Sequence, residues 1–193
     1  MEGKVPISTY DTMYERFEEE KIYHIMYFNL LPNNQRYMLT VQPYIININE
    51  TTIITLLQEN IPLIPSNIFR PQHYRQLISL ASATNFLPDV VGRICLIQGS
   101  DLYNPYTDSK IIIGLRLDRS KLLRLTLWDK EASNFRELNH ISARKNQIVI
   151  ITSIIPRLHE GKLSFTTTHG SRFYFDNDID IIQRFENRNK LLS

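Results

Sequence analysis

The chain has 193 residues, of which 42% are hydrophobic and 22% are charged, and its formal net charge is +2. These values predict one or two compact domains and exclude a disordered or fibrous chain. The small positive charge permits an anionic partner without requiring one. The single cysteine, Cys95, excludes internal disulfides and a cysteine-rich zinc site. Residues 1–21 contain no apolar signal core, and no segment reaches the roughly 18 apolar residues of a membrane span. We therefore expect a cytosolic or nuclear protein.

Strand signals dominate the chain, and a few short helices interrupt them. The pattern predicts a helix over 10–21, strands over 21–28, 35–41 and 44–49, and a helix over 70–82. It continues with a strand over 110–117, a strand ending at Trp128, a helix over 129–138, and strands over 147–155, 162–168 and 171–175. Three prolines between residues 60 and 71 favour a linker there. We expect a mostly β fold.

The only tryptophan ends one of these strands. In "LRLTLW", alternation places Leu123, Leu125 and Leu127 on one face and Arg124, Thr126 and Trp128 on the other. The indole therefore shares the polar face. It is either a packing residue at the end of the strand or a platform for a ligand.

The two halves of the chain repeat one order of elements. Each has a strand ending in an aromatic residue, a short helix ending in Phe, an apolar strand, a polar turn and a second strand. Tyr10 aligns with Trp128, and after an insertion residues 22–25 align with 148–151. A helix between the third and fourth strands of a small Greek-key barrel is the plan of an OB-fold. The second copy has two earlier strands, near 89–99 and 109–118, so we expect tandem OB-folds of which the first is N-terminally truncated.

The predicted boundaries follow from this repeat. They are a partial OB-fold over 1–65, a linker with a short helix over 66–87, and a complete OB-fold with a C-terminal helix over 88–193. A barrel without its first two strands exposes sheet edges, which invite pairing with another chain or with residues near Leu56 and Ile61.

Several segments follow the pattern of one family. In the second half they are "DVVGRI", "LRLTLWDKEASNF", "IVIITSIIPRLHEGKLSFTTT" and "FDNDIDI", and in the first half they include "YERFEEEKIYHIMYF" and "RYMLTVQPYIININETTI". Through them the chain resembles the large subunit of replication protein A, and more closely the plant replication-protein-A-like OB proteins. The resemblance implies binding of single-stranded DNA, in the nucleus. The family's zinc-bearing barrel and assembly helix have no counterpart, so we expect no heterotrimer formed by that route.

The resemblance also implies which aromatic residues stack on bases. By position they are Tyr10 and Tyr37 in the first barrel, and Trp128 with Leu158 in the second. Leu158 departs from the family pattern because it has no π system, so its neighbour His159 is the alternative platform. Tyr10 and Tyr37 are equally well explained as ordinary strand tyrosines.

Cations complete the predicted groove. Arg116 and Arg124 share the polar parity with Gly114, and basic residues on the adjoining turns would form the walls. The wall residues are Arg144, Lys145, Arg157, Lys162 and Arg172. Taken one at a time, each of these residues is explained equally well as an ordinary solvated surface residue.

The remaining sequence patterns predict no metal site, phosphate loop or catalytic site. The "DNDID" segment lacks the glycine and distal glutamate of a calcium loop and predicts a turn into the C-terminal helix. The histidines have no paired metal spacing, and no phosphate loop or catalytic constellation is present. We expect no cofactor and no enzymatic activity. Cys95 lies in an apolar run and is expected to be buried.

Two functions follow. The first is sequence-tolerant binding of single-stranded DNA, with RNA left open, in DNA replication, repair or recombination. The alternative is an OB-fold scaffold for protein–protein interaction, or a homodimer through an exposed edge, with little affinity for nucleic acid.

Overall fold

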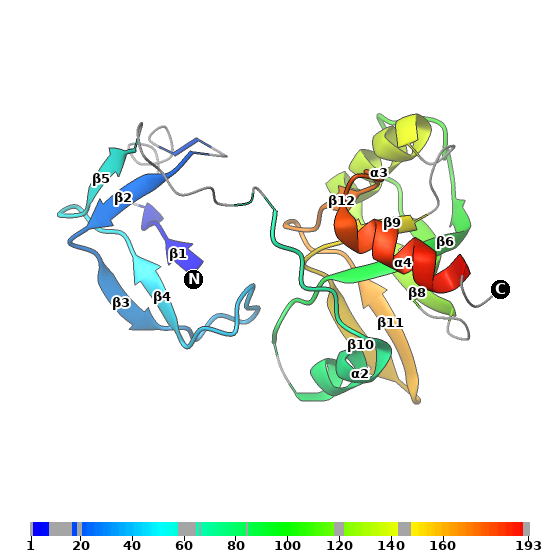
Figure 1. Cartoon of the computed structure of the whole chain (residues 1–193), viewed down its shortest axis with the longest axis horizontal. Coiled ribbons are helices and arrows are strands. Elements are labelled where there is room, and N and C mark those ends of the chain that lie inside the picture. Colours follow the sequence, from blue (N-terminus) through cyan, green and yellow to red (C-terminus); the bar gives the residue numbers. More distant parts are fainter. Residues whose placement is uncertain are drawn as a thin grey trace. The chain divides into compact units, whose positions relative to one another are not determined.

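The computed structural model describes residues 2–7, 17–18, 21–57, 65, 67–83, 85–117, 122–142 and 148–190. The chain divides into two compact units, Met1–Ile68 (unit 1) and Phe69–Ser193 (unit 2), shown in Figure 1. In the described part of the chain, no helix combines the length and the apolarity needed to cross a bilayer.

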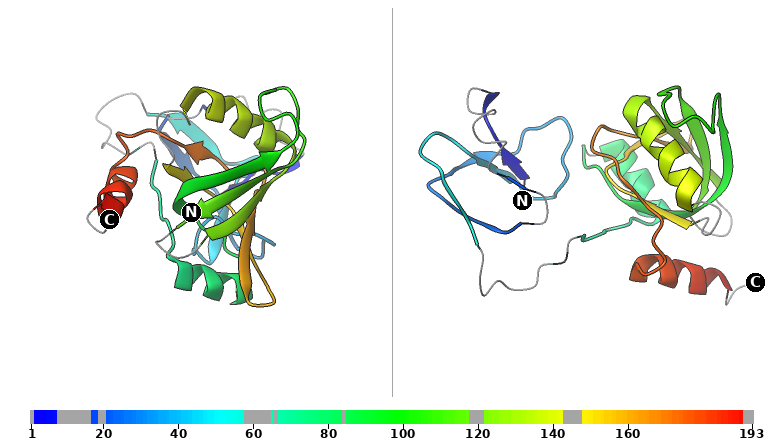
Figure 2. Two further views of the ribbon diagram at one scale, coloured as in Figure 1. Left: turned by 90° about the vertical axis from the view of Figure 1, so that its right-hand side faces the viewer. Right: turned by 90° about the horizontal axis from the view of Figure 1, so that it is seen from above.

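Unit 2 contains one seven-stranded sheet and three helices, which lie at separate places around the strands (Figure 2). The strands are β6 (Val90–Gly99), β7 (Ile111–Arg116), β8 (Leu122–Leu127), β9 (Ile148–Ile151), β10 (Ile155–His159), β11 (Lys162–Thr166) and β12 (Phe173–Tyr174). The helices are α2 (Tyr74–Ala83), α3 (Asp129–Ser142) and α4 (Asp180–Lys190).

The strand order of unit 2 is β10-β11-β8-β7-β6-β9-β12, and β8 and β11 are parallel. β9 and β10 are two halves of one strand, separated by a bend in which Ser153 has φ 54°. The bend lets the first half pair with β6 and the second half with β11. Five strands with a helix after the third, α3, form the Greek-key arrangement of an OB-fold. The predicted mostly β, OB-type fold is confirmed.

Alternation along β8 separates the core from the surface. Leu123, Leu125 and Leu127 are buried, whereas Leu122 and Arg124 are exposed. α3 adds Phe135 to the same core, where its ring centroid lies 5.4 Å from that of Phe173 in an edge-on contact. Burying each such side chain stabilises the fold by about 1.5–3 kcal/mol.

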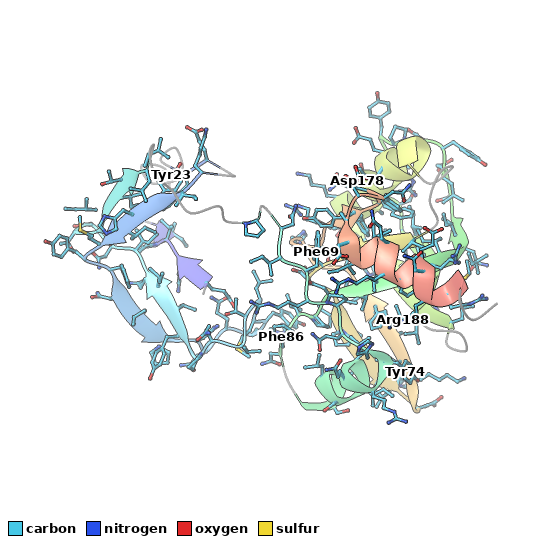
Figure 3. The ribbon with its side chains drawn as sticks, in the orientation of Figure 1. Tyr23, Phe69, Tyr74, Phe86, Asp178 and Arg188 are labelled. Atoms are coloured by element: carbon cyan, nitrogen blue, oxygen red, sulfur yellow. The ribbon has the colours of Figure 1, made fainter. Side chains whose placement is uncertain are left out.

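Residues 69–87, which the sequence assigns to a linker with a short helix, pack on unit 2. Leu77 of α2 is fully buried in the core of this unit. Asp89 fastens the preceding segment, because its carboxylate accepts hydrogen bonds from the backbone N–H of Arg70 (2.9 Å) and of Ser153 (3.3 Å). Phe69, labelled in Figure 3, packs edge-on against Tyr174 with a centroid distance of 4.7 Å.

Unit 1 repeats part of this topology. Its strands are β1 (Glu2–Lys4), β2 (Tyr23–Met26), β3 (Asn29–Pro32), β4 (Tyr44–Asn47) and β5 (Ile53–Leu56). β1 is parallel to β4, β3 is antiparallel to β4, and β2 is antiparallel to β5. In unit 2, β8, β11, β10, β9 and β12 pair in the same way. No described strand of unit 1 corresponds to β6 or β7.

The repeat extends to single hydrogen bonds. Tyr27, with φ 58°, bends the chain between β2 and β3 as Ser153 does between β9 and β10. Each bend residue accepts a hydroxyl hydrogen bond on its carbonyl oxygen, from Thr52 at 3.4 Å and from Ser171 at 3.0 Å. Both hydroxyl-bearing residues are buried. The alignment of residues 22–25 with 148–151 is therefore confirmed by structure as well as by sequence.

Two local expectations are wrong. Residues 35–41 form a loop instead of a strand, because the carboxylate of Glu2 accepts the backbone N–H groups of Leu39 (2.7 Å) and Thr40 (3.0 Å), which then do not enter a sheet ladder. Cys95 is exposed, because Val90, Gly92 and Ile94 are the buried positions of β6 and alternation gives Cys95 the outward parity.

Candidate nucleic-acid interface

The face of the unit-2 sheet that points away from the core carries the predicted groove residues; we call it the outer face. Strand registers align one row across it, in the order Arg157, Ser164, Arg124, Gly114 and Leu96. These five residues come from five neighbouring strands. Because directly paired residues project to the same side of a sheet, the row forms one continuous strip.

Trp128 lies at the rim of the outer face, immediately after β8. Its indole N–H donates to the hydroxyl of Thr166 at 2.9 Å, and its backbone N–H donates to Thr167 Oγ1 at 3.3 Å. The side chain is 47% exposed and is not part of the core. The Nζ atom of Lys110 lies 5.4 Å from the ring centroid, a cation–π distance. The structure thus fixes the plane of the ring and leaves half of it open to solvent.

Cations surround this face without acidic partners. Arg116, Arg124, Arg157 and Lys162 are all exposed, and within the described part of the chain none of them forms an ion pair. The outward residues of β7, β8, β10 and β11 include no aspartate or glutamate. Their positive charge is therefore available to an anion. Arg172 lies elsewhere, where its guanidinium donates to the carbonyls of His169 and Ser171.

The β10–β11 hairpin decides which of two neighbours can face a ligand. A two-residue turn, Glu160 and Gly161, both with positive φ, pairs His159 with Lys162 and Leu158 with Leu163. His159 and Lys162 therefore share the parity of Arg157 on the outer face. Leu158 has the parity of the core, although its place at the tip leaves it 40% exposed. Of the two alternatives for a second platform, the register favours His159.

Gly114 forms the floor of a shallow hollow in the outer face. The hollow has a volume of about 240 Å³, and Leu96, Leu122 and Arg124 are among the residues that line it. A Cβ atom on Gly114 would lie 3.0 Å from Cβ of Leu96, so a larger residue would both fill the hollow and crowd its wall. An apolar floor beside Arg124 suits a flat, partly apolar ring attached to an anion.

The loop 100–109, between β6 and β7, carries two residues that sequence reasoning missed. Tyr103 and Tyr106 are 91% and 95% exposed. The sequence did contain a signal for them, because the two tyrosines lie three residues apart in a segment rich in turn residues. Side chains this exposed gain nothing from core packing, and each presents a flat ring to solvent.

A buried arginine holds this loop in place. Arg136 of α3 is 2% exposed, and its guanidinium donates to four carbonyl oxygens of the loop. The acceptors are the carbonyls of Asp101 (3.1 Å), Thr107 (2.9 Å), Ser100 (2.9 Å) and Ser109 (2.7 Å). Burial lowers the pKa of Arg136 below its ordinary value, with Asp101 and Asp108 opposing that effect. Ser133, one turn earlier, adds a hydrogen bond to the carbonyl of Pro105 at 2.9 Å. The loop is thus fixed along α3, next to the strand end that carries Trp128.

Unit 1 does not reproduce the cationic strip. Its register matches Glu2 with Arg124, Ile45 with Ser164 and Leu31 with Arg157. Glu2 holds the loop 33–43 through backbone N–H groups, and Ile45 is buried. Tyr37 lies in that loop, half-buried, with the Arg36 guanidinium 5.5 Å from its ring centroid.

Three predicted residues lie outside the described part of the chain: Tyr10, Arg144 and Lys145. The register of unit 1 places Lys4 where unit 2 has Thr126, so the position equivalent to Trp128 is Pro6. The alignment of Tyr10 with Trp128 stays a prediction, because the structure does not describe Tyr10.

The described residues contain no group of three or more His, Cys, Asp and Glu side chains placed to hold a metal ion. The chemistry available at the outer face is stacking, hydrogen bonding and charge attraction.

Comparisons with known proteins place this geometry among OB-folds. No protein-family model and no curated protein matches the chain. Among solved structures it is similar to a chain of a replication protein A heterotrimer bound to ssDNA, with 16% identity and a TM-score of 0.56 over 97% of this chain and 43% of that one. Our chain therefore spans less than half the length of that neighbour.

Two weaker similarities are to other DNA complexes. One is the Ifi202 HINa domain with 20bp dsDNA, at 18% identity and a TM-score of 0.47 over 89% of this chain and 76% of that one. The other is Schizosaccharomyces pombe Pot1pC bound to ssDNA, at 12% identity and a TM-score of 0.41 over 66% and 100%. At such identities the similarity to the replication protein A structure shows a shared fold, in agreement with the strand order of unit 2.

Proposed function

We propose that unit 2 binds single-stranded DNA across its outer face, with little sequence preference, in DNA replication, repair or recombination in the nucleus. The observation that carries the proposal is the orientation of Trp128. Its indole is half-exposed, is held by Thr166, and follows β8, whose exposed Arg124 forms no ion pair within the described part of the chain. A residue needed only for packing would have its ring in the core. The proposal assigns no enzymatic activity and no cofactor.

The energetics suit a sequence-tolerant binder. Stacking on an aromatic side chain contributes about 1–3 kcal/mol per base, and every base offers a π-face. Since Lys110 lies over one face of the Trp128 ring, a base would stack on the other face. Arg116, Arg124, Arg157 and Lys162 would then follow the phosphates.

Tyr103 and Tyr106 extend this surface. The Arg136 hydrogen bonds hold their loop in one conformation before a ligand arrives, so binding would not have to order it. We assign the two tyrosines a role in stacking on bases beyond the one at Trp128.

The comparisons support the same function. The replication protein A neighbour is part of a heterotrimer bound to ssDNA, and the family that the sequence resembles binds single-stranded DNA. Oligonucleotide binding on the face of strands two and three and on the adjoining loops is a general use of the OB-fold.

The test is binding of a fluorescein-labelled oligo-dT, measured by anisotropy, with wild type and Trp128→Ala. Loss of one stack predicts a Kd about 5- to 150-fold higher in the variant. Leu158→Ala, on the opposite parity of the hairpin, is the control and should change the Kd less than about twofold. In wild type, the same oligonucleotide should quench the single tryptophan. Equal binding by Trp128→Ala and wild type would overturn the groove assignment.

Unit 1 favours a second candidate function, protein binding. It has an acidic residue where the cationic strip of unit 2 has Arg124, and its own loop 33–43 is held to that residue. Its strand edges, in contrast, are open in the described part of the chain.

A further inference from the structure

A second row of outward residues crosses the outer face of unit 2, next to the row that contains Arg124 and on the side away from Trp128. In sheet order its members are His159, Lys162, Leu122, Arg116 and Arg93. All of them except Leu122 are basic. The aromatic rim at Trp128 and this basic row therefore lie on opposite sides of the row of Arg124.

The basic row ends at helix α4. Beyond Arg93 the register continues to Ile148 of β9, which is 1% exposed. Ile148 is covered because it packs with Ile182 and Phe185 of α4, the helix drawn in red in Figure 1. A strand of nucleic acid that followed the basic row would thus have to end at Arg93 or leave the sheet there.

Arg93 and Arg116 are direct partners across β6 and β7. The Cβ atoms of directly opposed residues lie about 4.5–5.5 Å apart, and like charges in such a pair repel each other. Arg116 is exposed and Arg93 is half-buried, and among the residues that the structure describes neither forms an ion pair. Two guanidinium groups at this spacing can both donate to one anion, which would remove the repulsion.

We infer that Arg93 and Arg116 bind the terminal phosphate of a single DNA strand. An internal phosphodiester carries one negative charge, whereas a terminal phosphomonoester carries about 1.5 to 2 at pH 7 and has three acceptor oxygens. The monoester therefore matches two guanidinium charges. It also needs no nucleotide beyond it, where α4 covers the sheet.

This inference rests on the proposed function, since the strand whose end is bound has to lie on the outer face of unit 2. It adds recognition of a strand end to binding along the strand. Free phosphate groups on DNA ends are the chemistry that distinguishes a cut strand from a continuous one.

The experiment uses the whole chain and three oligo-dT probes of about ten nucleotides, within the range of site sizes known for OB-folds. One has a 5′-phosphate, one has a 3′-phosphate and one has hydroxyl groups at both ends, and each has fluorescein on an internal base. We expect one of the two phosphorylated probes to have a Kd about tenfold lower than the hydroxyl-ended probe, because it adds charge-assisted hydrogen bonds. Which of the two it is identifies the end that occupies the site.

Two matched variants separate the end site from general charge attraction. Arg93→Gln should abolish the preference for the phosphorylated probe and change the Kd of the hydroxyl-ended probe less than about twofold, because that probe has no phosphate to place at Arg93. Arg157→Gln, on β10 at the other side of the sheet, should weaken both probes equally and leave their ratio unchanged.

The single cysteine reports the location of the phosphate. Cys95 is exposed and follows Arg93 by two residues on β6. At saturating concentrations, the preferred phosphorylated probe should slow the alkylation of Cys95 by iodoacetamide at least about threefold more than the hydroxyl-ended probe does. A structural effect of the Arg93 substitution would not produce this difference in the wild-type protein.

Three results would overturn the inference. They are equal Kd values for all three probes in wild type, a preference that persists in Arg93→Gln, and a preference without any difference in the alkylation of Cys95. The hydroxyl-ended probe and Trp128→Ala report on strand binding separately. Strand binding without end preference would leave the proposed function intact, whereas no binding of any probe would overturn both.

Discussion

Asp89 shows how one carboxyl joins three parts of unit 2. It accepts hydrogen bonds from the segment before α2 and from the bend of the fourth strand, at Arg70 and Ser153. Burial raises the pKa of Asp89 above its ordinary value, although the two backbone donors and the charge of Arg70 act in the opposite direction. The folded protein therefore binds this proton more tightly than the unfolded chain does.

The direction of this pKa shift predicts how the stability of the fold depends on pH. A carboxyl with a raised folded-state pKa stabilises the fold fully below its unfolded pKa, near 4, and loses that contribution as pH rises through the folded value. In Asp89→Asn this pH dependence should disappear, while the loss of one accepted hydrogen bond lowers stability by about 1 kcal/mol at neutral pH. Urea unfolding of wild type and variant from pH 4 to pH 7 measures both effects. Parallel profiles for the two proteins would show that Asp89 does not titrate in this window.

At the scale of elements, α3 fixes the conformation of a loop that precedes it in the chain. Its residue Arg136 satisfies four carbonyls of the loop 100–109, which carries the exposed Tyr103 and Tyr106. Buried carbonyls without donors cost about 1–3 kcal/mol each where water cannot replace the donor.

Arg136→Met should therefore destabilise unit 2 by about 3 kcal/mol and make the loop accessible to protease. Oligo-dT affinity should fall with it, although Arg136 itself is buried. Ser133→Ala removes one hydrogen bond to the same loop and serves as the control, with an expected loss of about 1 kcal/mol. If Arg136→Met binds oligo-dT as well as wild type does, the loop has no part in binding.

At the scale of the whole molecule, the two units share a topology and differ in charge and completeness. Unit 2 has a closed core and a cationic outer face, whereas unit 1 has Glu2 in the cationic row and an open apolar side. The two copies of the fold therefore present outer faces of different charge.

This division predicts the salt dependence of binding. Each phosphate neutralised on a single strand contributes about 0.7 to the slope of log K against log salt. If Arg116, Arg124, Arg157 and Lys162 supply the contacts, the slope should be about −3. Arg124→Ala should reduce its magnitude by about 0.7, whereas Arg184→Ala, on α4 and paired with Asp180, should leave it unchanged. A much steeper slope would mean that further cations take part.

The sequence by itself determined the features that depend on periodicity. Alternation in "LRLTLW" was enough to put Trp128 on the polar face, because successive strand residues always project to opposite sides. The internal repeat was likewise visible, since a pattern of strands and one helix survives changes of individual residues. These features need only neighbours in the chain.

The tertiary structure decided everything that depends on distant partners. Residues 35–41 became a loop because Glu2, more than thirty residues away, takes their N–H groups. The face of His159 followed from the pairing of β10 with β11. Arg136 found its acceptors in a loop 27 to 36 residues earlier. Each outcome depends on hydrogen bonds between residues that come close together only in the folded chain. Local sequence propensity therefore cannot predict it.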